Sequence, residues 1–117
     1  MKKDSENLIV KLSIEFALDI IAFSETLEVS GKYVIAKQLL RSGTSIGANV
    51  HEAQNAESKA DFIHKLKVAA KEANETDYWL MLCELSANYP KPEHLREKLK
   101  SILNIISKII ITTKSNQ

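Results

Sequence analysis

Residues 41–53 read RSGTSIGANVHEA and lie in the middle of a chain of 117 residues. The two glycines of this stretch are four positions apart, so in a helix they share a face at which another backbone can come close. Polar residues recur at spacings of four, four and three, which stacks them along one side of the same helix. They are Arg41, Ser45, Asn49 and Glu52. Because buried polar groups need partners, the stretch predicts a helix packed closely against an antiparallel neighbour.

The composition is typical of a single globular domain over residues 1–117. Hydrophobic residues make up 44% of the chain and charged residues 26%, and the chain has 3 glycines and 2 prolines. A turn-rich all-β fold needs more glycine and proline, so we expect an all-α protein. The single cysteine, Cys83, excludes an intramolecular disulfide. The chain shows neither a secretory leader nor an apolar run long enough to span a bilayer, so we expect a cytoplasmic protein without membrane contact.

Apolar residues repeat every three or four positions in four segments, which is the helical period. Gly31 is suited to ending the first segment, Ser58 to capping the third, and Pro92 to opening the fourth. Short loops between helices make sequential helices antiparallel neighbours, so we predict an antiparallel up-down-up-down four-helix bundle. The predicted helices span residues 5–28, 32–55, 59–88 and 92–113.

The first predicted helix has a second apolar stripe beside its core face, formed by Ile14, Leu18 and Ile21. The last predicted helix is rich in isoleucine between residues 102 and 111. An apolar surface wider than one bundle can cover favours contact between copies of the chain. We therefore expect the first and last helices to support a homo-oligomer.

Folding the second and third helices back on each other at residues 57–58 brings Arg41 beside Glu75, with Glu72 as a second carboxylate. Small residues on both helices would let them approach closely around this ion pair. The interpretation we favour is a buried network that fixes the helix register, and the alternative is a polar pocket. Removing Arg41 should then destabilise the fold. The predicted network consists of Gln38, Arg41, Ser45, Asn49, Glu52, Glu72 and Glu75.

Catalytic and metal-binding patterns are absent from the sequence. His51 and His64 would face each other across the turn between the second and third helices, but no third ligand lies at a reliable spacing. The sequence has no nucleophile–base motif and no glycine-rich phosphate loop. We expect a non-enzymatic protein without a cofactor or a metal.

Positive charge gathers toward the end of the chain. Residues 91–117 hold six basic and two acidic residues, whereas residues 1–30 hold three basic and six acidic ones. A basic surface can contact the phosphates of RNA or DNA, and without interleaved aromatic residues such contact tolerates any base sequence. The candidate contacts are Lys59, Lys65, Lys67, Arg96, Lys98, Lys100, Lys108 and Lys114.

Two segments resemble a known family. They are QLLRSGTSIGAN at residues 38–49, followed by Glu52-Ala53 and SKADF at 58–62, and KEANETDYWL at residues 71–80. Together they resemble the bacterial four-helix-bundle proteins first described from 23S rRNA intervening sequences. The resemblance implies a ring-like homopentamer and relatedness to the accessory protein of diversity-generating retroelements, which binds nucleic acid and a reverse transcriptase. It implies no catalytic residues.

These observations lead to three functional hypotheses. The first is a homo-oligomeric bundle without enzymatic activity that contacts RNA or DNA weakly through its basic surface. The second is a protein-binding adaptor, for example for a reverse transcriptase, with no nucleic-acid contact of its own. The third, which we favour least, is an enzyme that uses the network of Arg41, Glu72 and Glu75.

Overall fold

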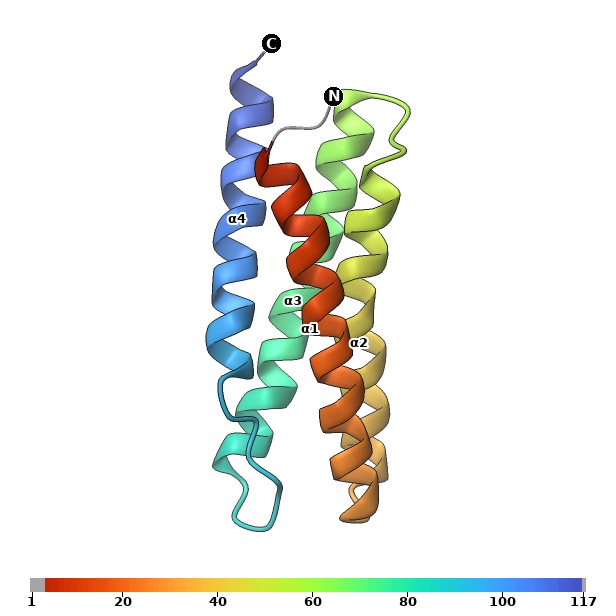
Figure 1. Ribbon diagram of the computed structural model, residues 1–117, viewed down its shortest axis with the longest axis vertical. Helices are drawn as coiled ribbons and strands as arrows, with labels where there is room; N and C mark the ends of the chain where they lie inside the picture. The colour runs from red at the N-terminus through yellow and green to blue at the C-terminus, as the bar shows by residue number, and fades with distance from the viewer. Residues whose placement is uncertain (1–3, 117) are drawn as a thin grey trace.

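The computed structural model describes residues 4–116, and it is a bundle of four helices without a strand in that range. Sequential helices run antiparallel, and the bundle measures 50 × 20 × 19 Å (Figure 1). The predicted all-α fold and its up-down-up-down order are therefore confirmed. The helices are α1 (Asp4–Val29), α2 (Tyr33–Ala53), α3 (Lys59–Leu85) and α4 (Leu95–Ser115).

Local signals in the sequence explain two of the helix ends. Gly31 has φ +79°, and the backbone N–H of Lys32 donates to the carbonyl of Leu27 at 2.8 Å, which ends α1 in the manner of a glycine C-cap. At the start of α3, Ser58 Oγ accepts a hydrogen bond from the Asp61 N–H at 3.0 Å. Both roles agree with the sequence prediction.

The loop between α3 and α4 is longer than predicted. Helix α3 ends at Leu85 rather than at residue 88, because Ser86 adopts an extended conformation and the Lys91 ammonium donates to the carbonyl of Glu84 at 3.2 Å. A lysine in this position satisfies carbonyls that a continuing helix would have used.

The predicted role of Pro92 as the first residue of the last helix is wrong. The Leu95 N–H donates to the Pro92 carbonyl at 3.0 Å, and Glu93 has φ +53°, in the left-handed region. This turn cannot be part of a right-handed helix. Helix α4 therefore begins at Leu95, three residues later than the proline predicts.

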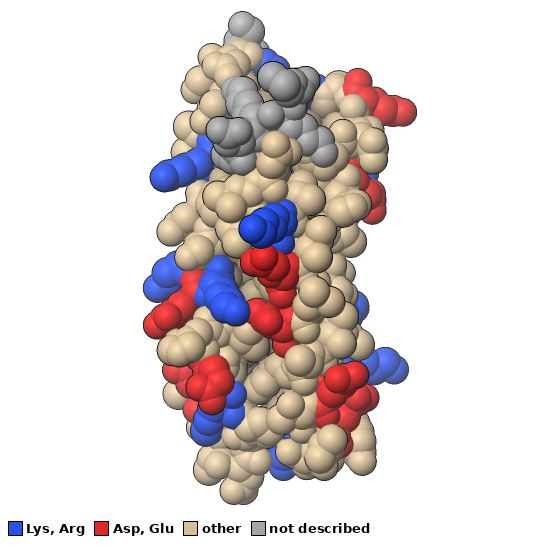
Figure 2. Space-filling view, viewed as in Figure 1, with Lys and Arg blue, Asp and Glu red and all other residues tan. Residues whose placement is uncertain are grey.

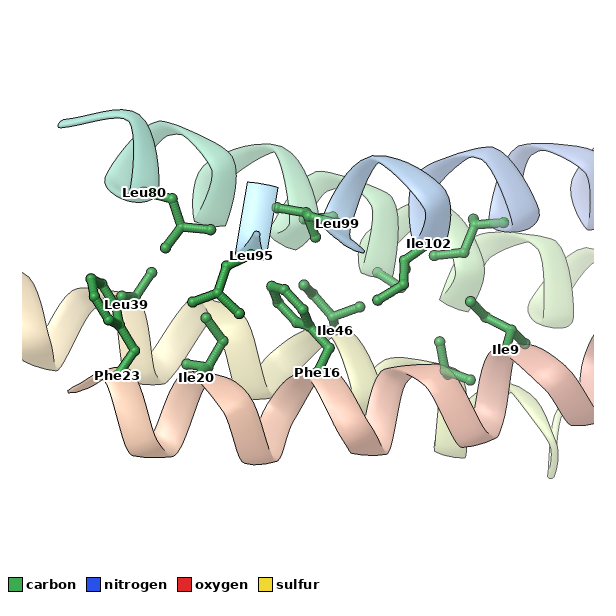
Figure 3. Packing of buried hydrophobic residues seen from close by; sticks show 14 of the residues in the cluster. Ile9, Phe16, Ile20, Phe23, Leu39, Ile46, Leu80, Leu95, Leu99 and Ile102 are labelled. Carbon is green, nitrogen blue, oxygen red and sulfur yellow. The ribbon is translucent and has the colours of Figure 1, made fainter. Parts of the chain in front are cut away.

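Aromatic and branched side chains from all four helices meet in one continuous core. Figure 3 shows Phe16, Ile20 and Phe23 of α1 pointing toward α2 and α4. The buried apolar residues repeat at helical spacing in the sequence, whereas the second stripe on α1, formed by Ile14, Leu18 and Ile21, is exposed. The largest fully buried side chains include Ile9, Phe16, Ile20, Leu27, Leu39, Ile46, Leu66, Leu80, Leu99, Ile102 and Ile106.

The glycines of α2 face α1 and not α3. A Cβ atom at Gly43 would lie 2.7 Å from Cγ2 of Ile20, and one at Gly47 would lie 3.3 Å from the carbonyl oxygen of Ser13. The predicted close packing against an antiparallel neighbour is therefore present, and the neighbour at the glycines is α1. The polar ladder faces α3 instead, because the glycines and the ladder occupy different sides of α2.

Candidate functional site

Three charged side chains meet on the seam between α2 and α3. Arg41 Nη1 lies 3.3 Å from Glu72 Oε1, and Arg41 Nη2 forms an ion pair with Glu75 Oε2. Trp79 Nε1 donates to the same Glu75 oxygen at 3.0 Å. The predicted contact of Arg41 with Glu75, and with Glu72 as a second partner, is present.

This cluster is open to solvent, so the prediction of a buried network is wrong. The side chains of Arg41, Glu75 and Glu72 are 50%, 37% and 22% exposed. The hydrogen bond from Arg41, and after it the one from Trp79, lowers the pKa of Glu75 below its ordinary value. Hydrogen bonding to Glu75 likewise raises the pKa of Arg41. The cluster links two helices at their surface.

The remaining members of the predicted network do not join it through their side chains. Ser45 Oγ donates to the Arg41 carbonyl at 2.7 Å, and Asn49 Nδ2 donates to the Ser45 carbonyl at 2.9 Å, so both satisfy their own helix. Glu52 pairs instead with Lys65 at 3.3 Å. Gln38 is half-buried and forms no side-chain hydrogen bond within residues 4–116.

The buried polar contact between α2 and α3 lies one position away from the predicted ladder. The Thr76 hydroxyl is 2.9 Å from Ser42 Oγ and 2.7 Å from the Glu72 carbonyl oxygen, and both Thr76 and Ser42 are fully buried. Sequence reasoning missed this pair. The signal was Thr76 itself, a hydroxyl within the apolar period of the third helix.

Cys83 and the histidines show no arrangement typical of a reactive or metal centre. Burial raises the pKa of the Cys83 thiol, which disfavours the nucleophilic thiolate. His64 and His51 are both exposed. Within the described part of the chain, no three residues of the His, Cys, Asp and Glu types are grouped so that they could hold a metal ion.

Several of the predicted nucleic-acid contacts are occupied by carboxylates. Arg96 binds Asp77 at 2.9 Å and Glu84 at 3.1 Å, which raises the pKa of Arg96. Lys98 binds Asp19 at 2.7 Å, and Lys65 binds Glu52. These three cations are thus neutralised locally. The other candidates are Lys59, Lys67, Lys100, Lys108 and Lys114. The first four of them form no ion pair within residues 7–116.

An exposed apolar area covers α1 and α2, which we call the α1–α2 face. Leu18 is 60% exposed, and Ile14, Ile21 and Leu40 are exposed by about two fifths. The face includes a shallow hollow of about 310 Å³ whose lining adds Thr44 and Ala48 of α2. Figure 2 shows an uncharged area over α1 and α2 on the right of the view.

The expected apolar excess is present on the first helix but not on the last one. On α4, the isoleucines at 102, 106 and 109 are buried in the core, and Ile111 is the large hydrophobic residue that is exposed there within the described range. Helix α2 has exposed apolar residues instead, among them Val34 and Leu40. The isoleucine repeat fills the bundle's own interior.

The fold defines a small four-helix-bundle protein with an exposed ion-pair cluster on the seam between α2 and α3. The model of the 23S rRNA-intervening sequence protein family matches residues 5–112, so the chain belongs to that family. The chain is also similar to a crystal structure from Bacteroides thetaiotaomicron VPI-5482, a protein with unknown function from the S23 ribosomal protein family. The two are 41% identical with a TM-score of 0.86, over 91% of this chain and 97% of that one.

Curated proteins provide no match to the chain. Within the described residues, no helix has both the length and the apolar character required to cross a membrane.

Proposed function

We propose that this chain is a non-enzymatic assembly protein whose copies associate through the α1–α2 face. The observation that carries the proposal is the exposure of Leu18, Ile14 and Ile21 in one stripe beside Leu40 of the neighbouring helix. Single exposed apolar residues are ordinary, but a contiguous apolar area on a small bundle favours a protein interface. The Arg41 cluster is held by ion pairs with Glu72 and Glu75 and lies outside this face.

The resemblance to the family motifs implies a ring-like homopentamer, and two further hollows support a ring. A ring needs two different surfaces that fit each other. Between α1 and α4 lie hollows of about 220 and 320 Å³, lined in part by Leu12, Phe16, Phe23 and Leu95. In the proposed assembly, the α1–α2 face of one copy packs on the α1–α4 side of the next.

Sedimentation of the purified chain and two variants tests the assembly. Leu18→Asp places a charge in the centre of the α1–α2 face, and it should convert the oligomer to a folded monomer. Leu85→Asp is the matched control, because Leu85 is 75% exposed at the end of α3 and lies outside that face. A wild-type monomer at micromolar concentration contradicts the proposal, and so does an oligomer that Leu18→Asp leaves intact.

We further propose that the assembly contacts RNA or DNA weakly, and that it is related to the accessory protein of diversity-generating retroelements. The acid-poor sequence of α4 supports nucleic-acid contact, because phosphates bind where lysines outnumber carboxylates. The alternative is an adaptor for a protein such as a reverse transcriptase. Titration with nucleic acid at two salt concentrations distinguishes the two hypotheses. A protein that contacts phosphates binds nucleic acid with an affinity that falls as salt rises, whereas a protein adaptor does not bind nucleic acid.

A further inference from the structure

At one end of the bundle lie two segments that contain lysines and no Asp or Glu. Helix α3 contains no Asp or Glu between residues 62 and 71, and the chain contains none between residues 98 and 116. Figure 1 shows that the start of α3 and the end of α4 lie at the same end of the molecule. The antiparallel order therefore brings two acid-free segments together.

Contacts between these segments place their lysines close to one another. The Lys59 ammonium donates a hydrogen bond to the Asn116 carbonyl, which holds the start of α3 against the end of α4. Lys67 is close enough to Lys114 that its positive charge lowers the pKa of Lys114. Lys71 follows Lys67 by four residues, so it lies on the same side of α3. An anion placed between such ammonium groups would relieve their mutual repulsion.

The other cations of the bundle have a different environment. Arg96, Lys98 and Lys65 each contact a carboxylate, so a phosphate that approached them would have to compete with it. By contrast, neither Lys67 nor Lys71 forms an ion pair recorded within residues 7–116, and both are exposed.

We propose that Lys59, Lys67, Lys71 and Lys114, here called the basic end, bind the phosphodiester backbone of a nucleic acid. This inference rests on the proposed function in one respect, because an assembly presents one basic end per copy and its affinity exceeds that of a monomer. Binding tolerates any base sequence, since lysine ammonium groups recognise phosphate as point charges and do not read base edges.

The test uses the full chain and a fluorescent single-stranded DNA of mixed sequence, about 30 nucleotides long, with binding followed by anisotropy. The double variant Lys67→Gln/Lys71→Gln should weaken binding at least tenfold. It should also reduce the slope of log affinity against log salt by about 1.4, because each lost phosphate contact on a single strand contributes about 0.7. The matched control is Lys65→Gln/Lys98→Gln, which removes the same charge from paired lysines and should change affinity less than twofold.

Sedimentation of the same variants separates this inference from the assembly. If Lys67→Gln/Lys71→Gln remains an oligomer and loses binding while the control retains it, the basic end is the site. Equal losses in both variants overturn the proposal, because net charge alone would then set the affinity. Binding to anionic lipid vesicles, without binding to the single-stranded DNA or to an RNA of the same length as that DNA, also overturns the proposal. Leu18→Asp should bind DNA through the same lysines with lower affinity, which shows that a failed assembly does not remove the site.

Discussion

At the scale of single residues, the exposure of Arg41 determines how much its ion pairs contribute. A buried charge pair that loses one partner destabilises a protein by about 3–5 kcal/mol. The Arg41 side chain is half exposed, and exposed pairs contribute about 1 kcal/mol or less. We therefore expect Arg41→Ala to reduce the free energy of unfolding at pH 7 by about 1 kcal/mol or less, as measured by urea denaturation.

The pH dependence of this difference follows from the pKa of Glu75, which Arg41 lowers in the folded state. A carboxyl with a lowered folded pKa stabilises the protein above its unfolded pKa, about 4.3 for glutamate, and this stabilisation is lost as the pH falls through the folded pKa. The difference between wild type and Arg41→Ala should therefore shrink between pH 5 and pH 3. A difference that stays constant over this range would contradict the assignment.

Helical spacing predicted the partners of Arg41 but not their depth. The antiparallel register follows from the loop at residues 57–58, so the proximity of Arg41 to Glu75 could be derived from the sequence. Whether a side of α2 lies inside the bundle depends on how the helix is rotated, which α1, α3 and the glycines decide together. For the same reason the buried contact between Ser42 and Thr76 escaped prediction.

At the scale of helices, the packing of α1 on α2 depends on a missing side chain. A Cβ at Gly43 would come within 2.9 Å of two atoms of Ile20, a core residue that cannot move aside easily. Alanine favours an isolated helix over glycine by about 1 kcal/mol, but overpacking a core typically costs about 1–3 kcal/mol. We expect Gly43→Ala to lower the free energy of unfolding despite its better helix propensity.

Gly47→Ala provides the internal comparison, measured in the same denaturation experiment. Its Cβ would meet the Ser13 carbonyl oxygen at 3.3 Å, a tight contact but a longer one than at Gly43. Both variants gain the same helix propensity, so the difference between them reports the packing alone. Gly43→Ala should be the less stable of the two, and the opposite order would contradict the close approach of α1 at Gly43.

Helix existence and order followed from apolar periodicity, whereas the loop after α3 did not. Pro92 satisfies the sequence rule for a first helical residue, but it is buried in a turn that Glu93 completes in a left-handed conformation. The rule describes what proline tolerates and does not specify where the preceding chain places it. The end of α3 at Leu85 also depends on the hydrogen bond from Lys91 to the Glu84 carbonyl. The spacing of apolar residues in the sequence cannot predict this contact across the loop.

At the scale of the whole molecule, an exposed apolar face should couple stability to concentration. If copies associate through the α1–α2 face, association stabilises the folded chain, and a tenfold rise in protein concentration adds up to about 1.4 kcal/mol per association step. For a domain of this size that corresponds to a rise in Tm of about 3–6 °C. A bundle that remains monomeric would show the same Tm at all concentrations.

Leu18→Asp and Leu85→Asp make this expectation specific to one surface. Both introduce the same charge at an exposed leucine, so their direct effects on the free energy of unfolding should be similar and small. Differential scanning fluorimetry at three concentrations should show a concentration-dependent Tm for wild type and Leu85→Asp and a constant Tm for Leu18→Asp. If Leu18→Asp keeps the dependence, another face holds the copies together; if Leu85→Asp loses it, the end of α3 belongs to the interface.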